Sequence, residues 1–284
     1  MILIADSGST KCDWVLVRED NSRENFFTMG FNPFFHSEKF IAEELHRQNI
    51  FNHLSDKVEN IFFYGAGCSS KQRNDIVKNG LQAIFPFAKI LIDHDLLASA
   101  YSLYEGKPMI ACILGTGSNS CFFDGKNVSE EVPALAYILG DEGSGSYYGK
   151  ILLKNFLYKQ LPEKISKTLK EEYHLTKEII FENVYQKPNA NVFLASLFRV
   201  MAKHKDEKFV TDTIKIGMKD FMENHIRCFK NYKNVNAGFV GSIGFYFEDI
   251  LRDVASQMEI SVGKIIKQPI NSLVDYHLKY IIKK

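Results

Sequence analysis

Two short turns in the sequence combine glycine with hydroxyl side chains, a composition suited to binding phosphate. The first turn follows the apolar run 2–5 and reads Asp6-Ser7-Gly8-Ser9-Thr10, after which an alternating run resumes over 12–17. This pattern predicts a β-hairpin with a carboxylate and hydroxyls at its tip. Backbone N–H groups in such a tip can bind phosphate, and Asp6 can hold Mg²⁺ directly or through water. The same residues also fit an ordinary tight turn.

A second turn of the same chemistry lies farther along the chain. The apolar run 109–114 leads into Gly115-Thr116-Gly117-Ser118-Asn119-Ser120, and a further strand-like run follows. Glycine permits a close approach of another group to the backbone, and the hydroxyls add donors beside it. No G-x-x-x-x-G-K-[ST] segment occurs, so neither turn is a Walker loop. Two strand–turn–strand tips, one near the start of each half, predict a two-lobed nucleotide site.

An acidic turn supplies the candidates for a general base. Asp93-His94-Asp95 is expected to follow a strand at 89–92 and to open a helix at 96–104. A carboxylate here could accept the proton of an acceptor hydroxyl during phosphoryl transfer. If residues 93–95 are extended, their two carboxylates point to opposite faces, so only one can serve. An aspartate at the start of a helix also fits an N-cap.

The elements that position these residues follow a repeated order. Strand and helix patterns alternate through the first hundred residues, and the strand pattern begins again at 109, which predicts an α/β fold with mixed sheets. The expected elements are strands at 1–28, 58–64, 89–92, 109–125 and 235–240, and helices at 37–54, 70–84, 96–104, within 144–178 and 190–232, and at 245–257. The boundary near 106–108 is expected to be a tight hinge.

The bulk composition describes a soluble globular protein. The 284 residues carry a net charge of +1 and are 45% hydrophobic, with no basic excess to indicate nucleic-acid binding. No apolar stretch approaches membrane-spanning length, and no secretion signal precedes the strand that begins at Ile2, so we expect a cytoplasmic protein. The five cysteines lack C-x-x-C spacing, and the histidines lack metal-binding spacing, which predicts reduced thiols and no zinc site.

Four motifs, taken in order, carry a resemblance that spans nearly the whole chain. They are DSGST at 6–10, GTGSN at 115–119, GDEGS at 140–144 and VGSIG at 240–244. In this order they resemble the sugar kinase/actin/Hsp70 ATPase superfamily, and most closely its N-acetylglucosamine kinase branch, grouped with the BadF/BadG/BcrA/BcrD ATPases. The resemblance implies two ribonuclease-H-like (actin-like ATPase) domains with mixed sheets and ATP in the cleft between them.

The resemblance also implies domain limits. The first lobe is expected over 1–107, completed by a C-terminal helix at 270–284, and the second lobe, with a helical insertion, over 108–269. The helical region 145–232 offers a surface for a possible homodimer.

The same resemblance assigns roles to individual residues. It implies that Asp6 holds Mg²⁺, that Asp95 is the catalytic base and also contacts the sugar, and that Asn32 and Asp141 bind the sugar. Asp95 is preferred to Asp93 because it starts the helix as the family's base does. The residues implied to bind the nucleotide are Ser9, Thr10, Gly115, Thr116, Gly117, Gly241 and Ser242.

One segment departs from the family pattern. Kinases of this branch that use N-acetylglucosamine usually carry Gly-Trp-Gly shortly before GDEGS, whereas this chain has Ala134-Leu135-Ala136. The aromatic platform for the sugar is therefore missing at that place, and Phe34 or Phe35 beside Asn32 could supply a ring from another side. The departure bears on the identity of the sugar more than on ATP binding.

The resulting expectation is an ATP- and Mg²⁺-dependent kinase that phosphorylates a hydroxyl, by analogy the 6-hydroxyl, of N-acetylglucosamine or a related amino sugar. Two alternatives are a non-catalytic sensor of ATP or sugar and a BadF-type ATPase activator of a dehydratase. Activators hold a cluster through paired cysteines, and the cysteines here do not offer that pattern. An actin-like filament is disfavoured by the short length.

Overall fold

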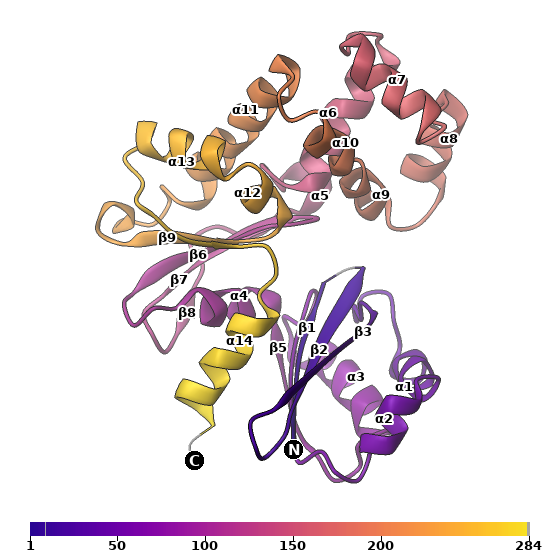
Figure 1. Cartoon of the computed structure of the whole chain (residues 1–284), viewed down its shortest axis with the longest axis vertical. Helices are drawn as coiled ribbons and strands as arrows, with labels where there is room; N and C mark the ends of the chain where they lie inside the picture. Colours follow the sequence, from indigo (N-terminus) through magenta and orange to yellow (C-terminus); the bar gives the residue numbers. More distant parts are fainter. Residues whose placement is uncertain (9, 283–284) are drawn as a thin grey trace. The chain divides into compact units, whose positions relative to one another are not determined.

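The computed structural model describes residues 1–8 and 10–282 and divides them into two compact units (Figure 1). Unit 1 comprises Met1–Ser102 together with the segment from Pro269, and unit 2 comprises Leu103–Gln268. The sequence places these limits at 107/108 and 269/270. The first division comes earlier because Leu103 belongs to the packing of unit 2, where a Cβ on Gly238 would lie 3.2 Å from its side chain.

Unit 1 is built on a mixed five-stranded sheet with the order β3-β2-β1-β4-β5. The β1–β2 and β2–β3 pairs are antiparallel, whereas β1–β4 and β4–β5 are parallel. Its elements are β1 (Ile2–Ser7), β2 (Lys11–Val17), β3 (Arg23–Met29), α1 (Glu38–His46), α2 (Asn49–Leu54), β4 (Asn60–Gly65), α3 (Lys71–Gln82), β5 (Lys89–His94), α4 (Asp95–Leu103, whose last residue belongs to unit 2), α14 (Ile270–Tyr276) and the π-helical turn His277–Ile281.

The two faces of this sheet are covered by different helices. Leu3 and Ala5 face a core formed with α1, α2 and α3, whereas Ile4 packs with Ala98 of α4 and Leu273 of α14. The alternation of Leu3, Ile4 and Ala5 thus places each side chain on the face that the period of a strand dictates. Burial on both faces explains why β1 reads as an unbroken apolar run.

Unit 2 repeats the strand order of unit 1. Its sheet has the order β10-β9-β6-β7-β8, with β6–β7 and β7–β8 antiparallel and β6–β9 and β9–β10 parallel. The strands are β6 (Met109–Leu114), β7 (Ser118–Phe123), β8 (Val128–Ser129), β9 (Asn236–Val240) and β10 (Val262–Ile266). The expected α/β fold with two mixed sheets is therefore confirmed.

The remainder of unit 2 is helical. The helices are α5 (Ala136–Leu139), α6 (Gly145–Leu157), α7 (Glu163–Glu171), α8 (Lys177–Phe181), α9 (Ala190–Ser196), α10 (Phe198–Lys203), α11 (Lys208–His225), α12 (Ser242–Tyr246) and α13 (Glu248–Gln257), with a π-helical turn at Glu182–Gln186 and a 3-10 turn at Tyr232–Asn234. One apolar core joins Ile110 of β6 and Phe239 of β9 to most of these helices.

Several local expectations need correction. The segment 37–54 forms two helices rather than one, and β5 continues through Asp93 and His94, so these residues are strand rather than turn. The strand β10 was not expected. All five cysteines are free, and none of the helices within residues 1–8 and 10–282 has the length and apolarity needed to cross a bilayer.

Candidate active site

The β1–β2 hairpin of unit 1 carries the first predicted phosphate turn. Asp6 is partly buried near the end of β1, where it pairs with Asp13 on one side and with Tyr64 on the other. The tip is closed by Gly8 N, which donates to Lys11 O at 3.0 Å. Thr10 is exposed at this tip, and Ser9 lies outside the described residues. The hairpin therefore carries Asp6 near the end of its first strand and the exposed Thr10 at its tip.

Asp6 lies in a group of acidic residues. Its burial and the charges of Asp95 and Asp13 raise the pKa of Asp6 from 3.8 to about 7. Lys11 compensates Asp13 at 2.5 Å. Bringing Asp6 and Asp95 together without a cation costs free energy, which a divalent ion would offset. Asp6 thus fits the Mg²⁺ site that the sequence predicts.

Protein ligands alone do not complete a metal centre here. Within the described residues, no group of three or more His, Cys, Asp or Glu side chains could hold a metal ion. Mg²⁺ bound to nucleotides uses one or two carboxylates and takes its other ligands from water and phosphate. One or two acidic ligands around Asp6 are consistent with that type of site and not with a structural metal.

The two candidate bases occupy different surroundings. Asp95 is the first residue of α4 and acts on the pKa of Asp6, whereas the charge of Asp93 raises the pKa values of Tyr64 and Tyr101. Asp93 Oδ1 also accepts from His94 N at 2.8 Å. The cap of α4 comes from His94, whose Nδ1 accepts from Leu97 N at 3.2 Å. An N-cap role is thus not needed to explain Asp95.

Asn32 lies on the loop that follows β3 and is buried. Its Oδ1 accepts from Phe34 N at 2.9 Å, and its backbone N donates to His36 Nδ1 at 3.2 Å. A Cβ on Gly67 would lie 2.5 Å from that Oδ1, so the loop after β4 packs directly on the amide. The Nδ2 group has no acceptor within residues 1–8 and 10–282. The Asn32 side chain is thus held through its oxygen, and the two N–H donors of Nδ2 are left to bind a ligand.

In unit 2 the second glycine turn rests on the start of α6. Gly145 N donates to Gly115 O at 2.8 Å, and Ser146 N donates to Thr116 O at 3.1 Å. Gly115 N closes the turn onto Gly117 O at 3.0 Å. The backbone N–H groups of Thr116 and Gly117 find no acceptor in the described part of the chain. Two amides of a fixed turn thus remain available to an anion.

Asp141 is tied to the same turn. It adopts a positive φ of 59°, and its Oδ1 accepts from Ser118 N at 3.2 Å. A Cβ on Gly117 would lie 2.9 Å from both carboxylate oxygens, so a side chain at 117 would displace the carboxylate. Burial raises the pKa of Asp141, and the Ser118 N–H partly offsets this effect. Asp141 therefore shapes the turn at 115–117, whatever else it binds.

Gly241 brings the fourth motif, VGSIG, into close contact with the start of the second motif, GTGSN. It directly precedes α12 with a φ of 126°, and a Cβ there would lie 2.1 Å from Leu114 O and 3.2 Å from Gly115 N. Its N–H donates to Ile266 O at 2.9 Å, which fixes it between β6 and β10. Ser242 follows as the first residue of α12. Unit 2 thus brings together Gly115, Thr116, Gly117, Asp141, Gly241 and Ser242, while unit 1 holds Asp6, Thr10, Asn32 and Asp95.

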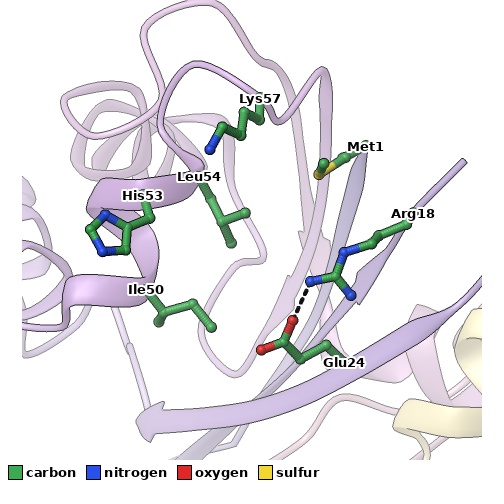
Figure 2. A pocket seen from close by; sticks show the side chains of 7 residues that line it. All are labelled: Met1, Arg18, Glu24, Ile50, His53, Leu54 and Lys57. Atoms are coloured by element: carbon green, nitrogen blue, oxygen red, sulfur yellow. Dashed lines mark hydrogen bonds and ion pairs between the residues drawn. The ribbon is translucent and has the colours of Figure 1, made fainter.

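One residue beside these sites was not predicted. Arg73, in the first turn of α3, donates from Nε to Gly67 O at 2.9 Å and lies 4.5 Å from the ring centroid of Phe34. The only hint in the sequence is the glycine- and serine-containing segment 65–70, which directly precedes α3. By contrast, a surface pocket of about 440 Å³ near Met1, Ile50 and the Arg18–Glu24 ion pair contains no candidate residue (Figure 2).

Comparison with known proteins first defines the class. No family model and no curated protein matches the chain. The "putative N-acetylglucosamine kinase" of Chromobacterium violaceum is 13% identical, with 97% of this chain and 98% of that chain covered and a TM-score of 0.70. A ROK family glucokinase from Streptomyces griseus, in complex with glucose and AMPPNP, is 14% identical over 96% and 98%, with a TM-score of 0.56. The fold is that of the sugar kinases and actin-like ATPases.

A more similar structure shows the family. The "putative N-acetylglucosamine kinase" of Porphyromonas gingivalis is 34% identical, with 99% of this chain and 100% of that chain covered and a TM-score of 0.93. The chain belongs to the family of this Porphyromonas gingivalis protein.

Proposed function

We propose that the protein is an ATP-dependent sugar kinase that phosphorylates the 6-hydroxyl of N-acetylglucosamine or a related amino sugar. The main support for this proposal is that Asp6 and Asp95 lie close enough for their charges to interact. A carboxylate that could bind the metal ion thus lies near a candidate base. The family relation to the Porphyromonas gingivalis protein and the glucose and AMPPNP bound by the Streptomyces griseus enzyme support it. Membership of the BadF-type group and a cytoplasmic location belong to the same proposal.

The residues divide the work of phosphoryl transfer. Ser9, Thr10 and the amides of Thr116 and Gly117 would bind phosphate oxygens, and Gly241 and Ser242 would bind the adenosine. Asp6 would hold Mg²⁺, which neutralises phosphate charge when it is bound. Little covalent help is needed beyond this, because phosphoryl transfer depends mainly on positioning and on charge stabilisation.

The acceptor side of the reaction depends on three polar residues. Asp95 would orient the acceptor hydroxyl and accept its proton as the new P–O bond forms and the bond from the γ-phosphorus to the leaving ADP breaks. Asn32 would donate to a sugar hydroxyl from Nδ2, which has no acceptor within residues 1–8 and 10–282. Asp141 would bind a second hydroxyl while it holds the turn at 115–117. Its raised pKa does not prevent this, since either protonation state can form a hydrogen bond.

Product analysis tests the reaction and its position together. The protein is incubated with Mg·ATP and N-acetylglucosamine, and the product is examined by ³¹P and ¹³C NMR. We expect a phosphate monoester on carbon 6, seen as coupling of that carbon to phosphorus. A monoester at another carbon would correct the position, and formation of no ester from any amino sugar would contradict the proposal.

A further inference from the structure

Arg73 is held in place by two hydrogen bonds to one loop. Its Nε donates to Gly67 O at 2.9 Å, and its Nη2 donates to Ser69 Oγ at 2.7 Å. Gly67 has φ +82°, a conformation that favours glycine. The guanidinium carries five N–H donors, of which these bonds use two. A partly buried arginine is therefore fixed with donors to spare.

The same guanidinium covers Phe34, which connects it to Asn32. Arg73 Cζ lies 4.5 Å from the ring centroid of Phe34, while Phe34 N donates to Asn32 Oδ1 at 2.9 Å. Phe34 remains 62% exposed, so contact with Arg73 leaves much of its surface open. We call Asn32, Phe34, Gly67, Ser69 and Arg73 the Arg73 cluster. It belongs entirely to unit 1.

The charge of Arg73 has no carboxylate partner within 4.0 Å among the residues of the described ranges. Most other arginines do have such a partner: Arg18, Arg23, Arg47, Arg227 and Arg252 each form an ion pair. Arg73 also lies within electrostatic range of the candidate active site. Burial is the main cause that raises the pKa of the Cys68 thiol, the charges of Asp95 and Asp93 raise it further, and the charge of Arg73 acts against them.

We propose that Arg73 is a specificity-determining residue that binds an anionic group, a carboxylate or a phosphate, carried by the sugar. A planar guanidinium suits such groups because it can present two parallel N–H donors to two oxygens. The exposed ring of Phe34 would contact the apolar face of the sugar, which replaces the aromatic platform absent at Ala134-Leu135-Ala136. This inference rests on the proposed function and narrows its substrate class from amino sugars to acidic amino sugars.

Binding measurements test the inference without requiring turnover. Isothermal titration calorimetry without nucleotide compares N-acetylglucosamine, N-acetylmuramic acid (its 3-O-lactyl ether, with a carboxylate) and N-acetylglucosamine 1-phosphate. We expect one of the anionic sugars to bind the native protein about 10 to 100 times more tightly than the neutral sugar. Which of the two anionic sugars binds more tightly shows whether the site prefers a carboxylate or a phosphate.

Two variants assign the preference to the guanidinium. Arg73→Gln removes the charge but keeps an amide donor for Gly67 O, and it should bring the anionic sugar to within about threefold of the neutral one, on the same energetic basis. Arg73→Lys keeps the positive charge but loses the two parallel N–H donors of the guanidinium, and it should retain part of the preference for the anionic sugar. Arg199→Gln is the matched control, because Arg199 is exposed on α10 in unit 2. Its loss should not change the affinity for the anionic sugar or for the neutral sugar.

Salt dependence keeps the test decisive if Arg73→Gln does not fold. Raising the ionic strength from about 0.05 M to about 0.5 M should weaken binding of the anionic sugar to the native protein and leave the neutral sugar unchanged. Equal affinity for neutral and anionic sugars in the native protein would overturn the inference. Tight binding of an anionic sugar with no phosphorylation of any sugar would instead contradict the proposed function alone.

Discussion

The carboxylates of Asp6 and Asp95 lie close enough for the charge of Asp95 to help burial raise the pKa of Asp6 to about 7. The two residues come from different elements, β1 and the start of α4, which the parallel β1–β4–β5 arrangement brings to one edge of the sheet. Without a cation this arrangement destabilises the ionised form of Asp6.

The first prediction concerns stability and pH. The raised pKa means that between about pH 4 and pH 7 the unfolded chain ionises Asp6 before the folded chain does, so the free energy of unfolding falls as the pH rises. Asp6→Asn removes this cost and should stabilise the metal-free protein at pH 8, by at most about 4 kcal/mol for a shift of this size. At pH 4 the two proteins should be nearly equal.

Thermal unfolding at pH 4 and pH 8, without nucleotide or Mg²⁺, provides the measurement. Asp275→Asn is the control, because Asp275 is an exposed surface residue that pairs with Arg23 in unit 1. A loss of stability in Asp6→Asn at pH 8 would show that the Asp6 carboxylate has a favourable partner in the folded state.

The second prediction separates the two candidate bases. Asp95→Asn should lower kcat by about 100-fold to 10,000-fold, since the general base is lost, and should leave ATP affinity within a few-fold. Asp93→Asn should have a small effect, because Asp93 Oδ1 is used by His94 N and its charge acts on Tyr64 and Tyr101. Steady-state kinetics and nucleotide titration measure both. A larger loss in Asp93→Asn would transfer the role to Asp93.

The third prediction concerns the close approach of Gly241 to β6. Gly241→Ala should weaken ATP binding and lower the melting temperature, because its Cβ would lie 2.1 Å from Leu114 O at a φ of +126°. Gly263→Ala is the control in β10, where the nearest atom is Asn236 Cβ at 3.2 Å. Nucleotide titration and thermal unfolding of both variants check this. Unchanged nucleotide affinity in a folded Gly241→Ala would argue against nucleotide contact at this turn.

The fourth prediction tests the amide of Asn32. Asn32→Asp keeps an oxygen to accept from Phe34 N but removes the Nδ2 donor, so the loop should persist while a bond to the sugar is lost. We expect KM for the sugar to rise by about tenfold, with KM for ATP unchanged. Asn79→Asp, a surface change beside Glu38, is the control. Equal kinetics for Asn32→Asp and the native protein would place the sugar elsewhere.

Much of the fold could be predicted from the sequence, because strong local signals coincide with it. The apolar runs at 2–5 and 109–114 became β1 and β6, which are the first strands of the two sheets in chain order, and the second run correctly marked a repeat of the first. The β10 strand was missed because every one of its residues, Val262–Ile266, is only partly buried, so it has no continuous core signal. The end of β5 was placed too early because Asp93 and His94 are polar.

The candidate site was less accessible to sequence reasoning, since its parts meet only in three dimensions. The motifs marked Asp6, Gly115, Asp141 and Gly241 individually, but the contact of Gly241 with Leu114 O depends on β9 pairing with β6. Arg73 carried no motif, because its position follows from the geometry of the loop that contains Gly67. Roles that depend on a bound ligand remain predictions for every one of these residues.

Sugar-dependent release of ADP is the most direct test of the central claim. A coupled assay with Mg·ATP is run against N-acetylglucosamine, N-acetylmannosamine, N-acetylmuramic acid, glucosamine and glucose, with the native protein and with Asp95→Asn. We expect at least one amino sugar to stimulate ADP release, and we expect that stimulation to disappear in Asp95→Asn while ATP still binds. If no sugar stimulates a native protein that binds ATP, the protein is not a kinase of these sugars, and a sensor of ATP or sugar becomes the better account.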